Sequence, residues 1–316
     1  MQNIFHESSY DDLDLFREQT GPLQMDILQL EKGRFNAAQQ ILDFGDISFC
    51  LTYYALRLTT RIEMASGHVT LALPFTEASW CGEYFPQHCA AVVLPNHQST
   101  TVLASNFFGL DVDTTEELAY KQRFLPEQWL HAPPSPLRAV LPTSRIAAKE
   151  LCLWVRALCY LLKNTLPDPT LIAALRERGI ELVQKALNVP SNTSQFSEPV
   201  NDCPGLVFSA QRLIDKHYHH PITVESLAEE LGVSERWLQI SFKKILGVSP
   251  YRYILLARLH GARRELAKNS SIGNAVTEAA LQNGFSNLGR FSQQYRALFG
   301  ELPNETLKLN KGPKMR

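Results

Sequence analysis

Two short segments near the C-terminal end carry basic and amide side chains at helical spacing. The residues concerned are Arg236, Gln239, Lys243 and Lys244 in the first segment, and Arg290, Gln293, Gln294 and Arg296 in the second. Arg and Gln can form paired hydrogen bonds with the major-groove edges of guanine and adenine. Lys and Arg at the flanks of such a helix suit phosphate oxygens. These residue types therefore predict contact with nucleic acid.

The two segments belong to an internal repeat, which indicates the elements that must position them. Residues 228–234 (AEELGVS) match residues 280–286 (ALQNGFS). Further landmarks follow in the same order: Leu238, Phe242, Lys243, Gly247 and Pro250 in the first copy, and Phe291, Tyr295, Arg296, Gly300 and Pro303 in the second. A repeated helix, tight turn and second helix is the pattern of a helix-turn-helix unit.

Several positions of the repeat have a structural task in that unit. The small side chains of Ala228 and Ala280 allow the second helix to approach the first closely. Gly232 and Gly284 supply the positive φ that a short turn between helices needs. Ser234 is expected to cap the helix that follows it. Each second helix should bury one stripe, formed by Leu238 and Phe242 or by their counterparts in the second copy, and expose the opposite face.

Residues 206–304 resemble the DNA-binding module of the AraC/XylS family of bacterial regulators. The motifs that carry the resemblance are ITVESLA (222–228), FKKILGVSP (242–250), YILLARL (253–259), NGFS (283–286) and FGELP (299–303). The resemblance implies two helical subdomains bridged by one long helix that begins near Pro250. It also implies that both recognition helices enter successive major-groove segments of double-stranded DNA, about one turn (~34 Å) apart.

Family roles can be carried over to single positions of this chain. The resemblance implies base contacts from Arg236, Gln239, Ile240, Gly289, Arg290 and Gln293. It implies phosphate contacts from Ser234, Lys243, Lys244, Asn287 and Arg296. It further implies a transcription regulator, with activation the expected sign and RNA polymerase an expected partner.

The charge distribution agrees with a nucleic-acid-binding C-terminal part. Residues 205–316 hold 16 Lys and Arg against 9 Asp and Glu, whereas residues 1–204 hold 15 against 23. A basic module attached to an acidic one is typical of a polyanion-binding domain joined to a domain with another task.

The rest of the chain predicts an α+β protein of two domains. The N-terminal domain should be a β-barrel or sandwich with a helical hairpin, and the C-terminal domain should be all-α with two helix-turn-helix units. Strands such as 47–53 and 69–73 are expected within 24–113, and helices within 114–187, including 145–162 and 170–187. The expected boundaries are 1–187 for a sensor and dimerisation domain, 188–205 for a linker, 206–309 for the DNA-binding domain and 310–316 for a basic tail.

The N-terminal domain is loosely similar to the β-rich sensor domains of such regulators. Tyr53, Trp80 and Tyr84 are candidates for an apolar pocket that binds a small-molecule effector, although aromatic residues in strands also build cores. The helices within 145–187 could form a homodimer interface or could cover the sheet of their own chain. A silent sensor domain that only holds a dimer together is a further alternative.

A ligand-binding or cupin-like catalytic barrel with the helical module as a tether is the rival interpretation. A metal site of that kind needs converging histidines, but His68, His88 and His97 are widely spaced and form no His-x-His pair. The six cysteines show no zinc spacing. We therefore expect no metal, no cofactor and no enzyme activity. The lack of a signal-peptide pattern and of a long apolar run predicts a cytoplasmic protein with no membrane partner.

Overall fold

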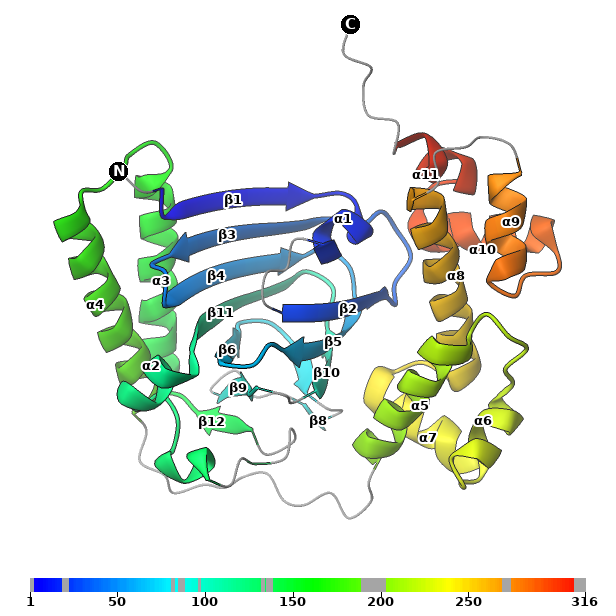
Figure 1. Ribbon diagram of the computed structural model, residues 1–316, viewed down its shortest axis with the longest axis horizontal. Coiled ribbons are helices and arrows are strands. Elements are labelled where there is room, and N and C mark those ends of the chain that lie inside the picture. The colour runs from blue at the N-terminus through cyan, green and yellow to red at the C-terminus, as the bar shows by residue number, and fades with distance from the viewer. Residues whose placement is uncertain are drawn as a thin grey trace, which may run out of the picture.

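The computed structural model describes residues 3–18, 23–80, 83–84, 89–95, 98–131, 134, 139–188, 203–268 and 274–309. A β-rich N-terminal domain and an all-α C-terminal domain lie side by side along the long axis of the molecule (Figure 1). Most of the expected linker and all of the expected basic tail lie outside the described residues.

The larger sheet has seven strands, and all of its neighbouring pairs are antiparallel. In spatial order the strands are β1 (Phe5–Tyr10), β3 (Ala37–Asp43), β4 (Ile47–Tyr54), β11 (Phe107–Thr115), β6 (His68–Pro74), β9 (Cys89–Val93) and β12 (Val140–Pro142). Alternate residues of these strands enter two different cores, as the two-residue period of a strand requires. Val69 and Leu71 enter one core, whereas Tyr54 and Phe107 enter the other.

The smaller sheet is antiparallel as well and completes the second of these cores. Its strands are, in spatial order, β2 (Leu23–Gln29), β5 (Leu58–Met64), β10 (Gln98–Leu103), β7 (Ala78–Trp80) and β8 (Glu83–Tyr84). Ile27, Leu58 and Trp80 pack with the inner face of the larger sheet. The short helix α1 (Leu13–Glu18) contributes Leu13 and Phe16 to the same core.

Two antiparallel helices pack against the other face of the larger sheet. They are α3 (Arg145–Leu162) and α4 (Pro169–Leu187), and they stand at the end of the molecule away from the C-terminal domain (Figure 1). The Ser144 and Asp168 side chains cap their N-termini. Before them come α2 (Glu116–Lys121), capped by Thr115, and a 3-10 helix (Glu127–Leu130). The hairpin thus buries one face in its own domain, as one of the two interpretations of the sequence expected.

The C-terminal domain consists of seven helices within the described residues. They are α5 (Cys203–His217), α6 (Val224–Glu230), α7 (Glu235–Leu246), α8 (Pro250–Lys268), α9 (Ala275–Gln282), α10 (Leu288–Phe299) and α11 (Pro303–Leu309). The long helix α8 contacts α5 and α7 on one side and α9 and α11 on the other. Buried residues from all seven helices form one cluster, which Leu28, Leu30 and Val102 of the N-terminal domain extend.

The expected fold class is therefore correct, and the differences concern where single elements occur and begin. The strands β1 and β12 lie outside the expected strand region 24–113, and α5 begins three residues before 206. The strand β1 escapes recognition because it buries only its terminal residues, Phe5 and Tyr10. Among the helices that the structure describes, none is both long and apolar enough to cross a membrane.

Candidate nucleic-acid interface

The first helix pair, α6 and α7, is held by local capping. Thr223 and Ser226 form a reciprocal capping box at the start of α6. Gly232 lies in the turn with φ of 66°. The hydroxyl oxygen of Ser234 accepts a hydrogen bond of 3.2 Å from the Trp237 N–H at the start of α7. These contacts satisfy N–H groups that have no partner within the helix, and so they fix where α7 begins.

The second pair, α9 and α10, repeats this design with different side chains. Gly284 lies in its turn with φ of 78°. Asn287 takes the place of Ser234, because its Oδ1 accepts a hydrogen bond of 2.9 Å from the Arg290 N–H. Both second helices end on glycines in the left-handed region, Gly247 at φ 70° and Gly300 at φ 73°. The repeat seen in the sequence is therefore a structural repeat.

The buried stripes of α7 and α10 explain their orientation. Leu238 and Phe242 are fully buried in the first unit, as are Phe291 and Tyr295 in the second. Ala228 and Ala280 are buried where each first helix meets its partner, which is the close approach expected from their small side chains. With these stripes directed inward, the opposite faces of α7 and α10 must point outward.

All six positions expected to contact bases lie on those outward faces. The exposed residues are Arg236, Gln239 and Ile240 on α7, and Gly289, Arg290 and Gln293 on α10. The five positions expected to contact phosphate are exposed too: Ser234, Lys243, Lys244, Asn287 and Arg296. Ser234 and Asn287 use their side chains as helix caps, so their phosphate contacts would be additional to that role. The structure thus gathers the expected site into two exposed faces, one on each unit.

The two aromatic residues of the expected pocket whose side chains the structure describes do not lie together. The Trp80 side chain is buried in the core between the two sheets. Tyr53 donates a hydrogen bond of 2.9 Å from its hydroxyl to Asn106 Oδ1, whereas its neighbour Tyr54 packs in the core. Consecutive strand residues point to opposite faces, so Tyr53 and Trp80 do not line one pocket. The side chain of Tyr84 lies outside the described residues, as do His88 and His97.

Sequence reasoning missed two half-buried carboxyl groups on β11. Burial raises the pKa of Asp111 to about 8, and repulsion from Asp113 adds to this effect. Burial also raises the pKa of Asp113, although a hydrogen bond from the Thr70 hydroxyl opposes the shift. Within the described part of the chain, no cluster of three or more His, Cys, Asp or Glu side chains could hold a metal ion.

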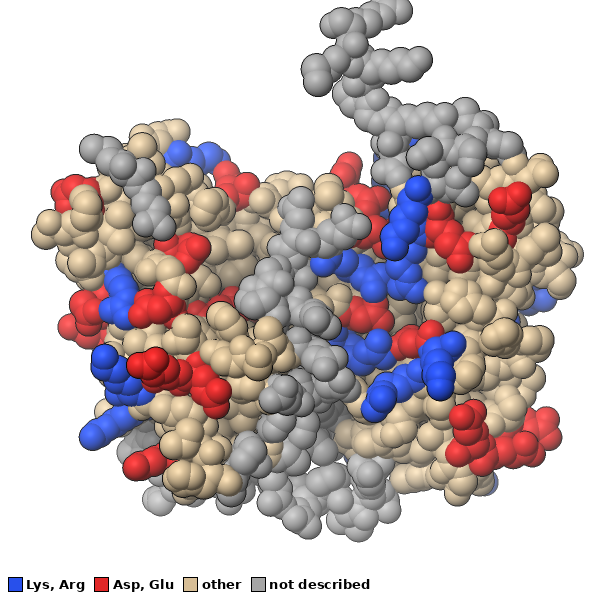
Figure 2. Space-filling model, viewed as in Figure 1, with Lys and Arg blue, Asp and Glu red and all other residues tan. Residues whose placement is uncertain are grey.

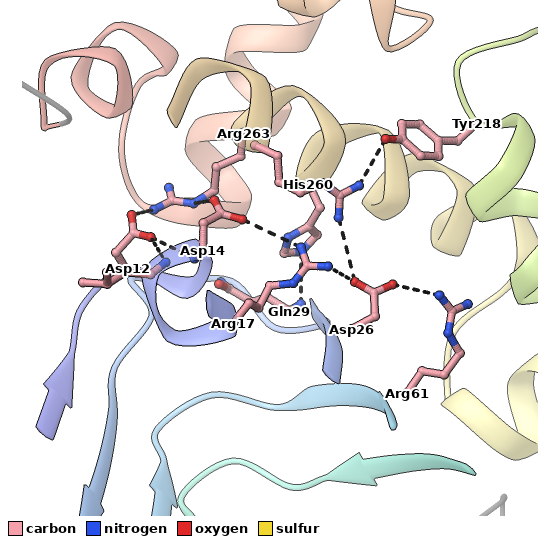
Figure 3. A network of polar contacts seen from close by, with 11 residues as sticks. Asp12, Asp14, Arg17, Asp26, Gln29, Arg61, Tyr218, His260 and Arg263 are labelled. Carbon is pink, nitrogen blue, oxygen red and sulfur yellow. Dashed lines mark hydrogen bonds and ion pairs between the residues drawn. The ribbon is translucent and has the colours of Figure 1, made fainter. Parts of the chain in front are cut away.

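A polar network joins the two domains and was also missed by sequence reasoning. Basic and acidic side chains lie close together along the junction between the domains (Figure 2). Arg263 of α8 is 5% exposed and pairs with Asp12, Asp14 and Glu301. Arg61 of β5 pairs with Asp215 of α5. It also pairs, at 3.2 Å, with Asp26 (Figure 3). The paired charges come from both domains, so the network fixes how the domains meet.

A buried histidine lies in the middle of this network (Figure 3). The Gln29 backbone N–H donates a hydrogen bond of 3.0 Å to Nε2 of His260. Burial lowers the pKa of His260 well below its usual value, and the nearby Arg264, Arg17 and Arg263 act in the same direction. The ring is therefore neutral, which leaves Nε2 free to accept this bond.

The C-terminal domain has the fold of the helix-turn-helix class, with one outward helix face on each unit. A family model described as "Helix-turn-helix domain" matches residues 227–309. The "Probable thc operon regulatory protein" of Rhodococcus erythropolis is 37% identical over 115 residues, 36% of this chain and 35% of that protein. "XylDLEGF operon transcriptional activator 2" of Pseudomonas putida is 39% identical over 100 residues, 32% of this chain and 64% of that protein.

One solved structure is similar to the C-terminal part of the chain as well. A probable AraC family transcriptional regulator from Rhodopseudomonas palustris is 36% identical, with coverage of 34% of this chain and 97% of that one and a TM-score of 0.31. The C-terminal part of the chain therefore carries the helix-turn-helix domain that the sequence predicted, and the two relatives named are regulators of transcription. The aligned part of the chain spans 35% of the length of the first of these curated relatives and 64% of the length of the second.

Proposed function

We propose that this protein is a sequence-specific DNA-binding regulator that activates transcription, with α7 and α10 reading successive major-groove segments. The observation that carries the proposal is the matched exposure of Arg236 with Gln239 on α7 and of Arg290 with Gln293 on α10. Activation is supported by the names of similar proteins, which include several XylDLEGF operon transcriptional activators. RNA polymerase is the partner that an activator requires.

The exposed residues divide into two roles within this proposal. Arg236, Gln239, Arg290 and Gln293 hydrogen-bond base edges, while Ile240 contacts a thymine methyl and Gly289 allows close approach of the backbone. The phosphate contacts come from Ser234, Lys243, Lys244, Asn287 and Arg296, and they make affinity fall with salt.

Base reading is tested with Arg236→Ala and Arg290→Ala. Wild-type protein first selects duplexes from a random-sequence library, and each variant is then titrated against every single-base change of the selected site. Each variant should lose about 1–3 kcal/mol of binding free energy and discriminate less at one base pair. Arg212→Ala, which removes an exposed arginine from α5, is the matched control and should keep the preference. Equal weakening on all sequences would show that the arginine binds phosphate only.

A homodimer through α3 is part of the proposal. Ile146, Leu153 and Tyr160 recur every seven residues and are 82%, 63% and 82% exposed, and Leu161 lies beside them. A seven-residue apolar repeat is the spacing by which two helices pack along one seam. Leu153→Glu should therefore shift the protein toward monomer in sedimentation velocity, whereas Arg212→Glu, at an exposed position of α5 outside the helical hairpin, should not. A wild-type monomer at micromolar concentration would refute the dimer.

A small-molecule effector in the N-terminal domain completes the proposal. Its support is the presence of a β-rich domain in contact with the DNA-binding domain, because such a contact can transmit a change between them. The test is a thermal-shift screen of the full-length protein, followed by DNA titration with and without each stabilising compound. A compound that stabilises the protein without changing DNA affinity would not be an effector.

A further inference from the structure

The N-terminal domain contacts the end of the first recognition helix. The guanidinium of Arg57 donates a hydrogen bond of 3.3 Å from Nη2 to the backbone carbonyl of Leu246, the last residue of α7. It lies so close to Gly247 that a Cβ there would be 2.3 Å from Nη2. The C-terminal end of a helix carries unpaired carbonyls and partial negative charge, which suits a cation.

The same domain contacts the end of the second recognition helix. The Leu298 carbonyl, in the last turn of α10, accepts hydrogen bonds from Gln29 Nε2 at 2.8 Å and from the Gly33 N–H at 2.9 Å. The Gln29 side chain is fully buried. Its backbone N–H is bound to His260 of α8, so one short segment contacts both the connecting helix and α10.

These two contacts come from one rigid piece of sheet. Gln29 ends β2, Arg57 comes immediately before β5, and the two strands pair antiparallel with Gln29 opposite Leu58. The Leu30 N–H also donates a hydrogen bond of 2.9 Å to the Arg57 carbonyl. The ends of α7 and α10 are therefore bound by neighbouring residues of one strand pair.

We propose that Arg57 and Gln29 are positioning residues by which the N-terminal domain sets the separation of the two recognition helices. The inference rests on the proposed DNA-reading function. Helix α8 connects the two units within the C-terminal domain, and the β2–β5 strand pair provides a further connection between them. The contacts are made at the C-terminal ends, so Arg236 and Arg290 near the N-terminal ends stay exposed. The docked domain thus adjusts the reading faces without covering them.

Additional contacts hold the β2–β5 strand pair against the C-terminal domain. Arg61 of β5 reaches Asp215 of α5 on the side of the first unit. On the side of the second unit, Asp12 pairs at 2.5 Å with Arg263, which also pairs with Glu301. Loss of Arg57 alone should therefore leave the domains docked and change only the separation of the helices.

The proposal predicts a loss of spacing selectivity. The probe is the duplex selected by full-length wild-type protein, together with duplexes in which the segment between its two elements is longer or shorter by one base pair. Arg57→Ala, Gln29→Ala and the double variant are titrated against all three. Arg178→Ala is the matched control, because this exposed arginine of α4 pairs within the helical hairpin. Arg57→Lys should retain part of the wild-type spacing selectivity, since it keeps a cation at the helix end.

We expect the ratio of affinities for the correct and the altered spacing to fall at least about fivefold in Arg57→Ala, the lower end of typical coupling between sites. An unchanged ratio would overturn the proposal, and so would equal weakening at every spacing, which is the result expected of a merely structural role. If Gln29→Ala does not fold, the result for Arg57→Ala alone tests the proposal. Arg57→Ala should fold, because the hydrogen bonds of the Arg57 backbone remain when its side chain is removed. Failure of wild-type protein to select any sequence would overturn the proposed function together with this inference.

Discussion

The substitution Gly261→Ala tests how tightly α8 binds the two helix-turn-helix units together. Gly261 lies within α8, and a Cβ at this position would be 2.2 Å from Asn283 Oδ1 and 2.5 Å from Tyr218 Cε2. Tyr218 follows α5, and Asn283 is the residue on which α9 ends. Both neighbours are buried, and Asn283 Nδ2 donates a hydrogen bond of 2.8 Å to the Ala279 carbonyl. Neither side chain can therefore retreat without losing a contact.

One favourable and two unfavourable terms set the size of the change in the free energy of unfolding. Alanine is favoured over glycine within a helix by about 1 kcal/mol. Overpacking of a core costs about 1–3 kcal/mol, and loss of the Asn283 hydrogen bond adds about 0.5–1.5 kcal/mol. The steric terms exceed the helix propensity, so we expect Gly261→Ala to lower the free energy of unfolding by about 1–2 kcal/mol.

The assay is urea denaturation of full-length protein followed by far-ultraviolet circular dichroism. Gly289→Ala is the matched control, because it makes the same change in α10, where the nearest atom to the new Cβ is Asn287 Oδ1 at 3.5 Å. The control should leave stability unchanged or raise it by up to about 1 kcal/mol. Equal or greater stability of Gly261→Ala would refute the close approach of α8 to both units.

Further predictions concern titrating groups of the N-terminal domain. Burial raises the pKa of Asp111 to about 8, so its contribution to stability is present at acid pH and is lost as pH rises toward 8. Asp111→Asn should therefore raise the free energy of unfolding near neutral pH by about 1–3 kcal/mol, as urea titrations at several pH values would show. A hydrogen bond from Arg176 lowers the pKa of Asp46, so Asp46→Asn should cost under about 1 kcal/mol at neutral pH, and this loss should vanish in acid. Burial raises the pKa of Cys152 to about 11 and of Cys159 to about 12, so iodoacetamide should alkylate them slowly until urea is added, as mass spectrometry would show.

The helix-turn-helix units could be predicted from the sequence because short-range rules determine them. The Ser234 cap, the positive φ at Gly232 and Gly284, and the start of α8 at Pro250 all depend on residues close together in the chain. The same is true of α3, for which the expected range 145–162 is the observed one. Apolar periodicity and capping residues are sufficient for such elements.

The sheets show where short-range rules fail. The order of the seven strands places β1 next to β3 and β12 next to β9, and no local signal specifies these partners. The direction of each aromatic side chain depends on that register, so the sequence could not tell that Trp80 enters a core while Tyr53 does not. The paired charges of Arg61 and Asp215 are 154 residues apart and were beyond reach for the same reason.

The chemistry of the domain junction explains how it holds the two domains together. Leu28 and Leu30 bury apolar surface against the C-terminal domain, which favours docking. Arg263 is almost fully buried, and its charge is balanced by Asp12 of one domain and Glu301 of the other. A buried charge that keeps its partners is tolerated, but one that loses a partner is costly, so small displacements of the interface are disfavoured. The junction therefore holds the domains in the docked arrangement, as the proposed control of the spacing of α7 and α10 requires.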